Sequence, residues 1–280
     1  MPELPEVEIT ARRIGAAIAG ATVESALAPG MNVLKTFDPP LAALTGRTVT
    51  GVRRRGKHLI VEFDGLSLLL HLMSAGRLQL FDKRAGPRDR TSRLLVRLAD
   101  GRELRLREFG TKQRAWAKLL QPGEVEQDEA VATLGPEAWP DPPPLEALRD
   151  APRPLHSLLR DQRVVAGIGR SWADEILHTA MVSPFKRGSD LTPEEAEALA
   201  ATIPVVLDGA MEHYERTVTL PIPDKLPMPL RVHRHEGEPC PRCGTTLERV
   251  SFEDYVIAYC PACQTEGRVL KDRRLSRLLK

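Results

Sequence analysis

Residues 240–263 read CPRCGTTLERVSFEDYVIAYCPAC, and this stretch contains all four cysteines of the 280-residue chain. The spacing is C-x2-C-x16-C-x2-C, and the residues between the two pairs alternate like a β-hairpin. Each C-x2-C turn directs two sulfur atoms at one centre, so two turns complete a tetrahedral ligand set. The sequence therefore predicts a Zn²⁺ site formed by Cys240, Cys243, Cys260 and Cys263.

Two disulfide bonds are the alternative interpretation of the four cysteines. The chain has no apolar run of the ~18 residues that a membrane span needs. Its acidic, proline-containing start does not resemble a secretory signal. We therefore expect a cytoplasmic protein, in which thiols stay reduced. Four thiolates leave no position for a water molecule, so the zinc ion is expected to be structural.

Charge is distributed unevenly along the chain, although the net charge is only +2. Residues 51–120 contain 17 Lys and Arg against 7 Asp and Glu, whereas residues 121–150 contain 8 acids and a single basic residue. Such an asymmetry indicates a polyanionic partner for the basic part. Arg makes up 31 of the 40 basic residues, and its planar guanidinium suits phosphate. A genome biased toward Arg codons would explain that proportion but not the clustering.

The periodicity predicts an α+β multidomain protein. Residues 5–19 have helical spacing, and residues 22–119 alternate as short antiparallel strands of a sandwich or barrel-like domain. Residues 146–216 are expected to be helical, and 217–238 to be loop. The expected domains are 1–120, a linker over 121–145, a helical domain over 146–230, and a zinc finger with a basic C-terminal tail over 231–280.

The chain begins MPELPEVE, with Pro2 directly after the initiator methionine. Removal of Met1 would convert Pro2 into a free secondary amine. An α-amino group has a pKa near ~8, so a useful fraction is neutral and nucleophilic at pH 7. The alternative is that proline and acids here only cap a helix, which both residue types favour.

The segment VVAGIGRSWADEIL, residues 164–177, contains two glycines before a predicted helix that starts near Ser171. Gly167 and Gly169 allow the backbone to approach a partner closely, and the amide groups at a helix N-terminus suit a phosphate. A plain turn between two helices is the alternative interpretation.

Four motifs occur in one order along nearly the whole chain: MPELPEVE at 1–8, GKHLI at 56–60, VVAGIGRSWADEIL at 164–177 and GEPCPRCG at 237–244. Together they resemble formamidopyrimidine-DNA glycosylase and endonuclease VIII. The resemblance implies an N-terminal antiparallel β-sandwich, a helix–two-turn–helix domain and a C-terminal four-cysteine zinc-finger hairpin. It also implies a base excision repair enzyme that binds double-stranded DNA containing a damaged base or an abasic site.

The resemblance further implies the roles of individual residues. Pro2 would form a Schiff base with the sugar, Glu3 would transfer protons during base loss, and Lys57 would contact a phosphate. The strand would then be cut by β-elimination, which is the AP lyase activity. The positions implied to contact or position the DNA are Glu6, His71, Met73, Phe109, Gly169, Arg170 and Tyr255.

Four positions depart from the family pattern. Arg170 stands where the family usually has Asn, and Tyr255 where it usually has Arg. Met73 lies one position early in an ungapped alignment, and the Arg expected directly before Phe109 is Glu108. An acid at position 108 is expected to face the DNA stack and either to weaken binding or to alter the opposite-base preference. Arg170 is expected to replace the phosphate contact that is lost at Tyr255.

The segment LPIPDKLP, residues 220–227, lacks the glycines of the flexible loop that covers an extruded oxidised purine in the family. Recognition of 8-oxoguanine is therefore not expected. The departures also leave a second interpretation open, in which the protein binds damaged or abasic DNA but excises little. In either case we expect a monomer associated with the nucleoid.

Overall fold

The computed structural model of the chain describes residues 1–280 except 87–88, 110–111, 142–145, 150, 253–254 and 271–280. The chain divides into two compact units. Unit 1 comprises residues 1–133 and 211–227, and unit 2 comprises residues 134–210 and 228–280. Most of the predicted basic tail lies outside the described residues, because the description ends at residue 270.

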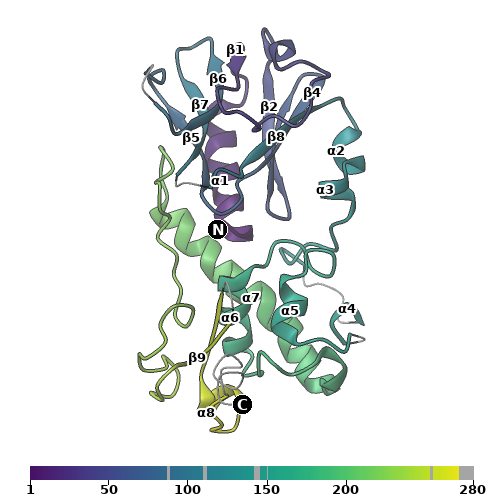
Figure 1. The fold of residues 1–280 in the computed structure, drawn as a ribbon, viewed down its shortest axis with the longest axis vertical. Helices are drawn as coiled ribbons and strands as arrows, with labels where there is room; N and C mark the ends of the chain where they lie inside the picture. Colours follow the sequence, from purple (N-terminus) through teal and green to yellow (C-terminus); the bar gives the residue numbers. More distant parts are fainter. Residues whose placement is uncertain (87–88, 110–111, 142–145, 150, 253–254, 271–280) are drawn as a thin grey trace. The chain divides into compact units, whose positions relative to one another are not determined.

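Unit 1 contains two four-stranded antiparallel sheets, which confirms the predicted sandwich (Figure 1). The first has the order β1-β6-β7-β5, with β1 Val23–Leu27, β5 Gly76–Phe81, β6 Ser92–Leu98 and β7 Glu103–Glu108. The second has the order β2-β3-β4-β8, with β2 Val49–Arg55, β3 His58–Phe63, β4 Leu66–His71 and β8 Trp116–Leu120. A short 3-10 helix, η1, spans Leu41–Leu44.

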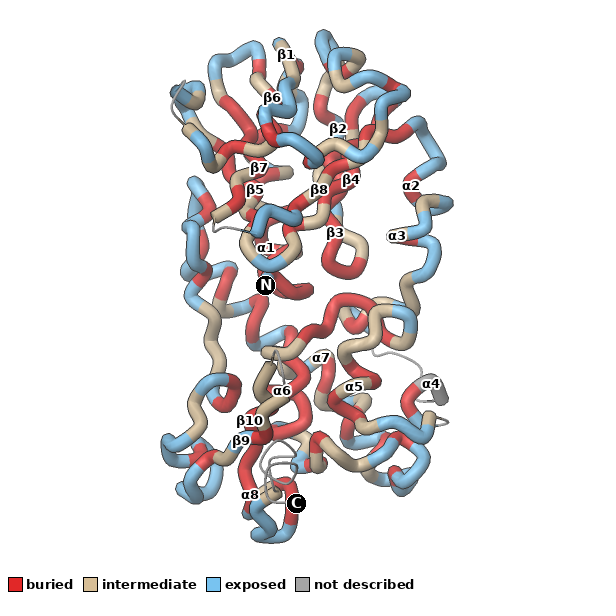
Figure 2. The backbone as a smooth tube through the Cα atoms, viewed as in Figure 1, coloured by how far each residue is buried: buried red, intermediate tan, exposed pale blue. Residues whose placement is uncertain are grey.

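Burial follows strand position in the sheets. The central strands β3 and β4 are buried along nearly their whole length, whereas Val49 is the one buried residue of the edge strand β2 (Figure 2). Uninterrupted apolar runs such as LIV at 59–61 and LLL at 68–70 suit strands that are covered on both faces. The apolar runs that predicted strands therefore form the core of unit 1.

Helix α1, Leu4–Ile18, packs against β2 and β3 of one sheet and β5 of the other. Its apolar residues Val7, Ala11, Ile14 and Ile18 are all buried, as their helical spacing predicts. Pro5 lies in the first turn, where the missing N–H costs nothing.

The expectation of a linker over residues 121–145 is wrong for its first part. Residues 124–132 form two short helices, α2 Glu124–Gln127 and α3 Glu129–Ala132. Val125 and Val131 from these helices are buried in a cluster with Ile60, Leu69 and Leu120 of the second sheet. Two valines among acidic residues give only a weak helical periodicity. The acidic and proline-rich composition of residues 121–145 is more typical of a linker, and it led to the wrong prediction.

Unit 2 contains the predicted helices and the cysteine hairpin. Its elements are α4 Glu146–Arg149, α5 Leu155–Arg160, α6 Arg170–Thr179, η2 Gly188–Asp190, the first part of α7 Pro193–Thr217, β9 Glu248–Ser251, β10 Val256–Tyr259 and α8 Pro261–Gln264. Thr192 caps α7: its hydroxyl accepts from the Glu195 N–H at 3.2 Å, and its own N–H donates to Glu195 at 3.0 Å. This reciprocal pair explains why α7 starts at Pro193.

The last part of α7 and the loop that follows it belong to unit 1. Ile222 is 1% exposed, and the Gln79 side chain of β5 donates hydrogen bonds to the Ile222 carbonyl and to the Asp224 carboxylate. The sequence instead assigns residues 211–227 to the helical domain.

None of the helices in the described part of the chain is long and apolar enough to cross a membrane.

Candidate active site and nucleic-acid contacts

The first residues of the chain are fixed by reciprocal hydrogen bonds at the start of α1. Pro2 is buried, and Glu3 and Glu6 are each 2% exposed. The Glu6 carboxylate accepts from the Glu3 N–H at 2.7 Å, and the Glu3 carboxylate accepts from the Glu6 N–H. The capping arrangement that competed with catalysis as an interpretation is therefore present. It also holds Glu3 and the adjoining Pro2 in one place.

Tyr214 of α7 completes this arrangement. Its hydroxyl donates to the second oxygen of the Glu6 carboxylate at 2.6 Å, and its ring is fully buried. Burial, with the negative charges of Glu6 and Glu3 adding to it, raises the pKa of Tyr214, so the phenol stays protonated and remains a donor. No sequence pattern indicated this residue, because Tyr214 and Glu6 lie 208 positions apart.

Arg77 places a positive charge near the same carboxylate. Its Nε donates to the Asp224 carbonyl and its Nη1 to the Gly76 carbonyl, each at 2.6 Å. Burial lowers the pKa of Arg77, while the charges of Asp224 and Glu6 act in the opposite direction. An Arg in an alternating strand looks like an ordinary solvated residue, which is why its place beside Glu6 was not predicted.

Lys57 and His71 lie close enough to interact electrostatically. Lys57 follows Gly56, which has a φ of 56° in the turn between β2 and β3. The Lys57 residue is 7% exposed. The His71 ring stacks on Trp116 with centroids 5.8 Å apart, and its Nδ1 accepts from the Met73 N–H at 2.9 Å. Burial, together with His58 and the Lys57 charge, lowers the pKa of His71 to about 3. The imidazole is therefore neutral, and Nε2 is its remaining donor.

Met73 occupies the turn between β4 and β5 in an unusual backbone conformation. Its φ of 49° lies in the left-handed region, which a side chain bearing a Cβ adopts rarely. The side chain is half-buried. The family pattern, which places Met one position later, leaves a different residue at this turn. Met73 thus lies in the expected loop, at the residue of that loop whose backbone has a left-handed conformation.

Phe109 is paired with Arg107 rather than with the residue directly before it. The Arg107 guanidinium carbon lies 4.7 Å from the Phe109 ring centroid. Successive side chains of a strand point to opposite faces, so 107 and 109 share a face and 108 does not.

The expectation that Glu108 faces DNA is wrong. Its side chain is 2% exposed, and its carboxylate accepts from the backbone N–H groups of Arg114 at 2.6 Å and Ala115 at 2.9 Å. Glu108 therefore holds the backbone at Arg114 and Ala115, directly before β8.

A second group of candidate residues lies in unit 2, around the turn between α5 and α6. Helix α6 begins at Arg170, and Gly169, the residue before it, has no side chain to cap the helix. The guanidinium carbons of Arg160 and Arg170 lie 4.4 and 4.6 Å from the Tyr255 ring centroid. Arg160 was not predicted, because only the fold brings the end of α5 to the hairpin.

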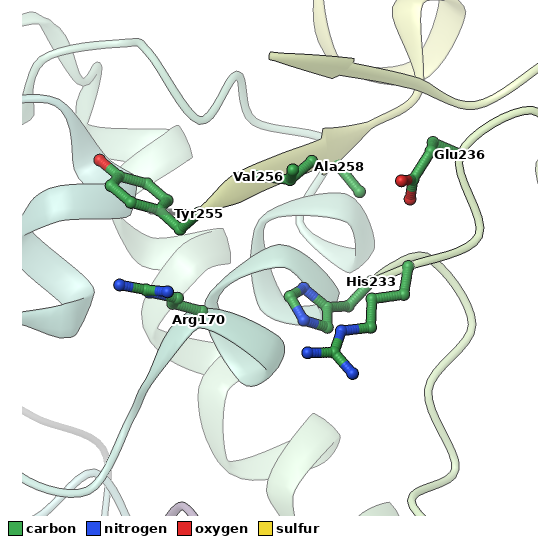
Figure 3. A pocket seen from close by; sticks show the side chains of 7 residues that line it. Arg170, His233, Glu236, Tyr255, Val256 and Ala258 are labelled. Atoms are coloured by element: carbon green, nitrogen blue, oxygen red, sulfur yellow. The ribbon is translucent and has the colours of Figure 1, made fainter. Parts of the chain in front are cut away.

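A hollow of about 440 Å³ adjoins this group, and Figure 3 shows Arg170 beside Tyr255 with Glu236 farther along the wall. His233 lines the hollow, and its Nδ1 is bonded to the Asp174 carboxylate at 2.7 Å. The neighbouring Glu175 carboxylate accepts three backbone N–H groups, those of residues 231–233. These two acids of α6 fix the chain that enters the zinc finger.

The four cysteine sulfur atoms all lie within 4.8 Å of one another. The separations include 3.5 Å for Cys243 with Cys260 and with Cys263, and 4.0 Å for Cys240 with Cys263. A tetrahedral zinc ion with Zn–S bonds of about 2.3 Å requires sulfurs about 3.8 Å apart, so the set fits the metal. The separations are too long for disulfide bonds.

His178 of α6 also contacts this cluster, since its Nε2 lies 3.2 Å from the Cys240 sulfur. Burial lowers the pKa of His178 to about 4, with Arg242 and Arg231 adding to the effect. A neutral imidazole can donate this N–H to a thiolate, as second partners of metal ligands commonly do.

Comparison with known proteins gives three consecutive matches along the chain. Residues 1–112 match the formamidopyrimidine-DNA glycosylase N-terminal domain, and residues 137–221 match the H2TH domain of the same family. Residues 237–265 match the zinc finger found in FPG and IleRS. The order is that of the motifs in the sequence.

The formamidopyrimidine-DNA glycosylase of Thermus thermophilus is 34% identical over 285 residues, covering 95% of this chain and all of the relative. The chain belongs to the formamidopyrimidine-DNA glycosylase family. The Pediococcus pentosaceus formamidopyrimidine-DNA glycosylase is 32% identical over 277 residues, covering 94% of the chain and 99% of the relative. The family comprises bifunctional DNA glycosylases and AP lyases of base excision repair, and its zinc finger makes the four cysteines of this member a structural zinc site.

Solved structures agree with this family assignment. The Lactococcus lactis Fpg in complex with abasic-site DNA aligns with a TM-score of 0.83 and 27% identity, covering 94% of this glycosylase and 99% of that chain. The same Lactococcus lactis protein with N7-benzyl-Fapy-dG DNA aligns with a TM-score of 0.84 and 28% identity, covering 94% and 100%. The predicted β-sandwich, helix–two-turn–helix domain and zinc finger are thereby confirmed.

Proposed function

We propose that this chain excises a damaged base from double-stranded DNA and then cuts the strand, with the amine of Pro2 as nucleophile. The observation that carries the proposal is the buried start of α1. There Pro2 directly precedes Glu3, and the Glu3 and Glu6 carboxylates each accept from the other's backbone N–H. The Glu6 carboxylate also accepts from the Tyr214 hydroxyl. A helix cap alone does not require a buried tyrosine donor from a distant helix.

In the proposed reaction, removal of Met1 releases the secondary amine of Pro2. The nitrogen attacks C1′ of the damaged nucleoside and forms an N–C1′ bond, while the bond from C1′ to the base breaks. The sugar ring opens to give an iminium ion, which withdraws electrons from C2′. Loss of a C2′ proton then expels the 3′ phosphate, and water hydrolyses the iminium to release the enzyme.

Glu3 is the proposed proton carrier. Its carboxylate is nearly inaccessible to solvent and is directed by the Glu6 N–H, so it holds one position while protons move to the ring oxygen and the departing base. Glu6 is a positioning residue, since its two oxygens are occupied by the Glu3 N–H and the Tyr214 hydroxyl. Arg77 offsets its negative charge.

The proposed DNA contacts in unit 1 are of two kinds. Lys57 and His71 suit phosphate oxygens, one as a cation and the other as a neutral N–H donor. Met73 and the stacked pair of Arg107 and Phe109 suit the space left by an extruded base, because they offer apolar and planar groups. Arg170 is the proposed phosphate contact in unit 2, next to the glycine turn.

Borohydride trapping tests the proposal directly. The protein is incubated with a duplex that contains one abasic site, reduced with sodium borohydride, and digested for peptide mapping by mass spectrometry. We expect a covalent DNA adduct on an N-terminal peptide that begins at Pro2. A purified protein that retains Met1, or an adduct mapped to a lysine, would overturn the assignment. Duplexes with single oxidised or formamidopyrimidine bases, 8-oxoguanine included, identify the lesion.

The protein is proposed to act as a monomer on the chromosome, and hence in association with the nucleoid in the cytoplasm. One Pro2 segment and one zinc finger per chain make a complete set of the residues assigned above. Size-exclusion chromatography with light scattering, with and without abasic DNA, should give one protein chain per duplex.

A further inference from the structure

Tyr255 stands in unit 2 where the family usually has a phosphate-binding arginine, and the structure shows what surrounds its ring. Arg160, the last residue of α5, and Arg170, the first residue of α6, both lie over it at 4.4 and 4.6 Å. A guanidinium within about 6 Å of an aromatic centroid is attracted by the ring quadrupole. The tyrosine therefore draws together two like charges from the two sides of the α5–α6 turn.

The ring itself is held by other aromatic groups. Phe252 stacks on Tyr255 with centroids 4.6 Å apart and planes 8° apart, and Phe252 in turn stacks on Phe185 at 6.5 Å. His156, one turn before Arg160 on α5, stacks at 6.2 Å with an interplanar angle of 11°. We refer to Tyr255, Arg160, Arg170, Phe252 and His156 as the tyrosine cluster. Stacking on several sides fixes the orientation of the ring, and hence of the two arginines.

Arg160 and Arg170 lie at opposite kinds of helix end. A cation is favoured in the last turn of a helix, where Arg160 lies, but disfavoured in the first turn, where Arg170 lies. The two charges also repel each other. An anion bound between the two guanidinium groups would be attracted by both of them.

The adjoining hollow, which is lined by Arg170 but not by Arg160, has room for an anion beside Arg170. Arg170, Arg234 and Tyr255 line it, and in Figure 3 the Arg170 and Tyr255 side chains lie together at one end while Glu236 lies at the other. Glu236 is engaged by Arg249 at 3.2 Å. An anion is therefore favoured at the Arg170 end of the hollow.

We propose that Arg160 and Arg170 together bind one backbone phosphate of the DNA, and that Tyr255 is the positioning residue that holds both guanidinium groups for it. This inference rests on the proposed function. In this chain the guanidinium absent at position 255 is supplied instead from the end of α5. Tyr255 itself does not bind the phosphate, but it positions the two arginines that do.

The salt dependence of DNA binding tests the arginines. Affinity for a duplex with a tetrahydrofuran abasic analogue is measured from about 50 to 300 mM salt. The proteins compared are wild type, Arg160→Ala, Arg170→Ala and Arg153→Ala. The last is the control, because it removes an exposed arginine that pairs with Asp161. Loss of one phosphate contact should lower the slope of log Kd against log salt by about 0.9. We expect each cluster variant to bind about 10-fold more weakly near 100 mM salt, and the control to change less than about 2-fold.

Substitution of Tyr255 tests the positioning role. Tyr255→Phe keeps the ring and should bind like wild type, whereas Tyr255→Leu removes the quadrupole and should weaken binding by about 3- to 10-fold. The double variant Arg160→Ala with Tyr255→Leu should bind only slightly more weakly than Arg160→Ala alone, because both changes remove the same contact. Arg160→Lys keeps the charge without the planar fork and should recover part of the slope.

The outcomes separate this inference from the proposed function. Borohydride trapping by the control Arg153→Ala should proceed at the wild-type rate, because Arg153 lies outside the tyrosine cluster and pairs with Asp161. If wild type traps and binds while Arg160→Ala behaves like Arg153→Ala, the paired-arginine site is wrong and the proposed function stands. Equal binding by Tyr255→Leu and Tyr255→Phe would remove the positioning role. Failure of wild type to form an adduct would instead overturn the proposed function. Unchanged zinc content and circular dichroism show that each variant is folded.

Discussion

The start of α1 in unit 1 and the tyrosine cluster in unit 2 hold their polar groups in different ways. At the start of α1, Glu3 and Glu6 are almost fully buried and are bound by hydrogen bonds to backbone groups and to the Tyr214 hydroxyl. In the tyrosine cluster, Arg160 and Arg170 are only half-buried, and the contacts that place them against Tyr255 are stacking contacts.

This difference matches the departures from the family pattern. The N-terminal motif is intact, whereas the region around α6 and the hairpin has exchanged Asn for Arg170 and Arg for Tyr255. Bond formation at C1′ requires particular atoms in one geometry, so a shift of about 1 Å is costly. A phosphate needs only positive charge and donors nearby, so the charge can come from a different residue. We therefore expect substitutions in the first region to reduce activity more than substitutions in the second.

The largest effect is expected from Glu3→Gln. An amide keeps an oxygen that can accept the Glu6 N–H, so the helix cap survives, but it cannot carry the proton. We expect base release to fall by about 10²- to 10⁴-fold, while affinity for an abasic analogue changes less than about 3-fold. Single-turnover excision and equilibrium binding measure the two quantities.

Glu8→Gln is the matched control, because Glu8 lies on the same helix but pairs with Arg12 and Arg54. It should excise at close to the wild-type rate. Equal losses in the two variants would mean that Glu3 acts through the stability of α1 and not as a proton carrier.

Removal of zinc should affect the second region and leave the first intact. The metal holds the hairpin that carries Tyr255, so its loss should disorder the tyrosine cluster. We expect abasic-site affinity to fall on the order of 100-fold and the salt slope to fall by about two phosphate contacts. Zinc content is followed by mass spectrometry during chelation and after Zn²⁺ is added back, which should restore binding. Borohydride trapping at saturating DNA should persist in the zinc-free protein, and its loss would show that the two regions are not separable.

Tyr214→Phe removes the hydroxyl that donates to Glu6. The carboxylate oxygen then loses a buried partner, which typically costs about 1–3 kcal/mol. We expect the trapping rate to fall by about 10-fold and the urea midpoint of unfolding to fall with it. Tyr259→Phe is the control, since the Tyr259 hydroxyl accepts from the Leu270 N–H in unit 2. If both variants lose the same stability and neither loses trapping rate, Tyr214 supports the fold alone.

The sequence predicted the sandwich, the long helices and the zinc site because each depends on local patterns. Alternation produces the strands, helical spacing produces α1, and two C-x2-C turns produce the metal site. The strand pattern could also have placed Glu108 correctly, since alternation puts it opposite Arg107 and Phe109. The family pattern expects Arg directly before Phe109, and following it led to the wrong prediction that Glu108 faces the DNA.

The remaining site residues depend on contacts between distant segments. Tyr214 meets Glu6 across 208 positions, and Arg160 meets Tyr255 because α6 packs against both α5 and β10. No local periodicity encodes either pair. Residues 211–227 likewise join unit 1 through the side chain of Gln79, which binds Ile222 and Asp224.

The histidines of unit 1 predict how its stability depends on pH. Burial lowers the pKa of His58 to about 4 and that of His71 to about 3, from the ordinary 6.5. The unfolded chain therefore binds more protons than the folded chain below about pH 6.5, so stability falls as pH decreases from about 6.5 toward 4. Fluorescence of Trp116, which contacts both rings, reports urea unfolding of unit 1 once Trp139 and Trp172 are replaced by Phe. His58→Leu should show a smaller decrease; an identical decrease would mean that His58 is not neutral in the folded state.

The smallest expected effect concerns DNA binding over the pH range in which an ordinary histidine titrates. If His71 contacts a phosphate as a neutral N–H donor, its charge stays constant between about pH 5.5 and 7.5, because its pKa is about 3. Affinity for the abasic analogue at fixed ionic strength should then vary by less than about 3-fold, and His71→Gln, which keeps a neutral donor, should share that flat profile. Tightening of wild type by more than about 5-fold toward pH 5.5, lost in His71→Gln, would instead show that DNA draws a proton onto the ring. Such a result would mean that His71 binds the phosphate through a positive charge, as the arginines of unit 2 are proposed to do. It would not then act through a fixed hydrogen-bond geometry like that at the start of α1.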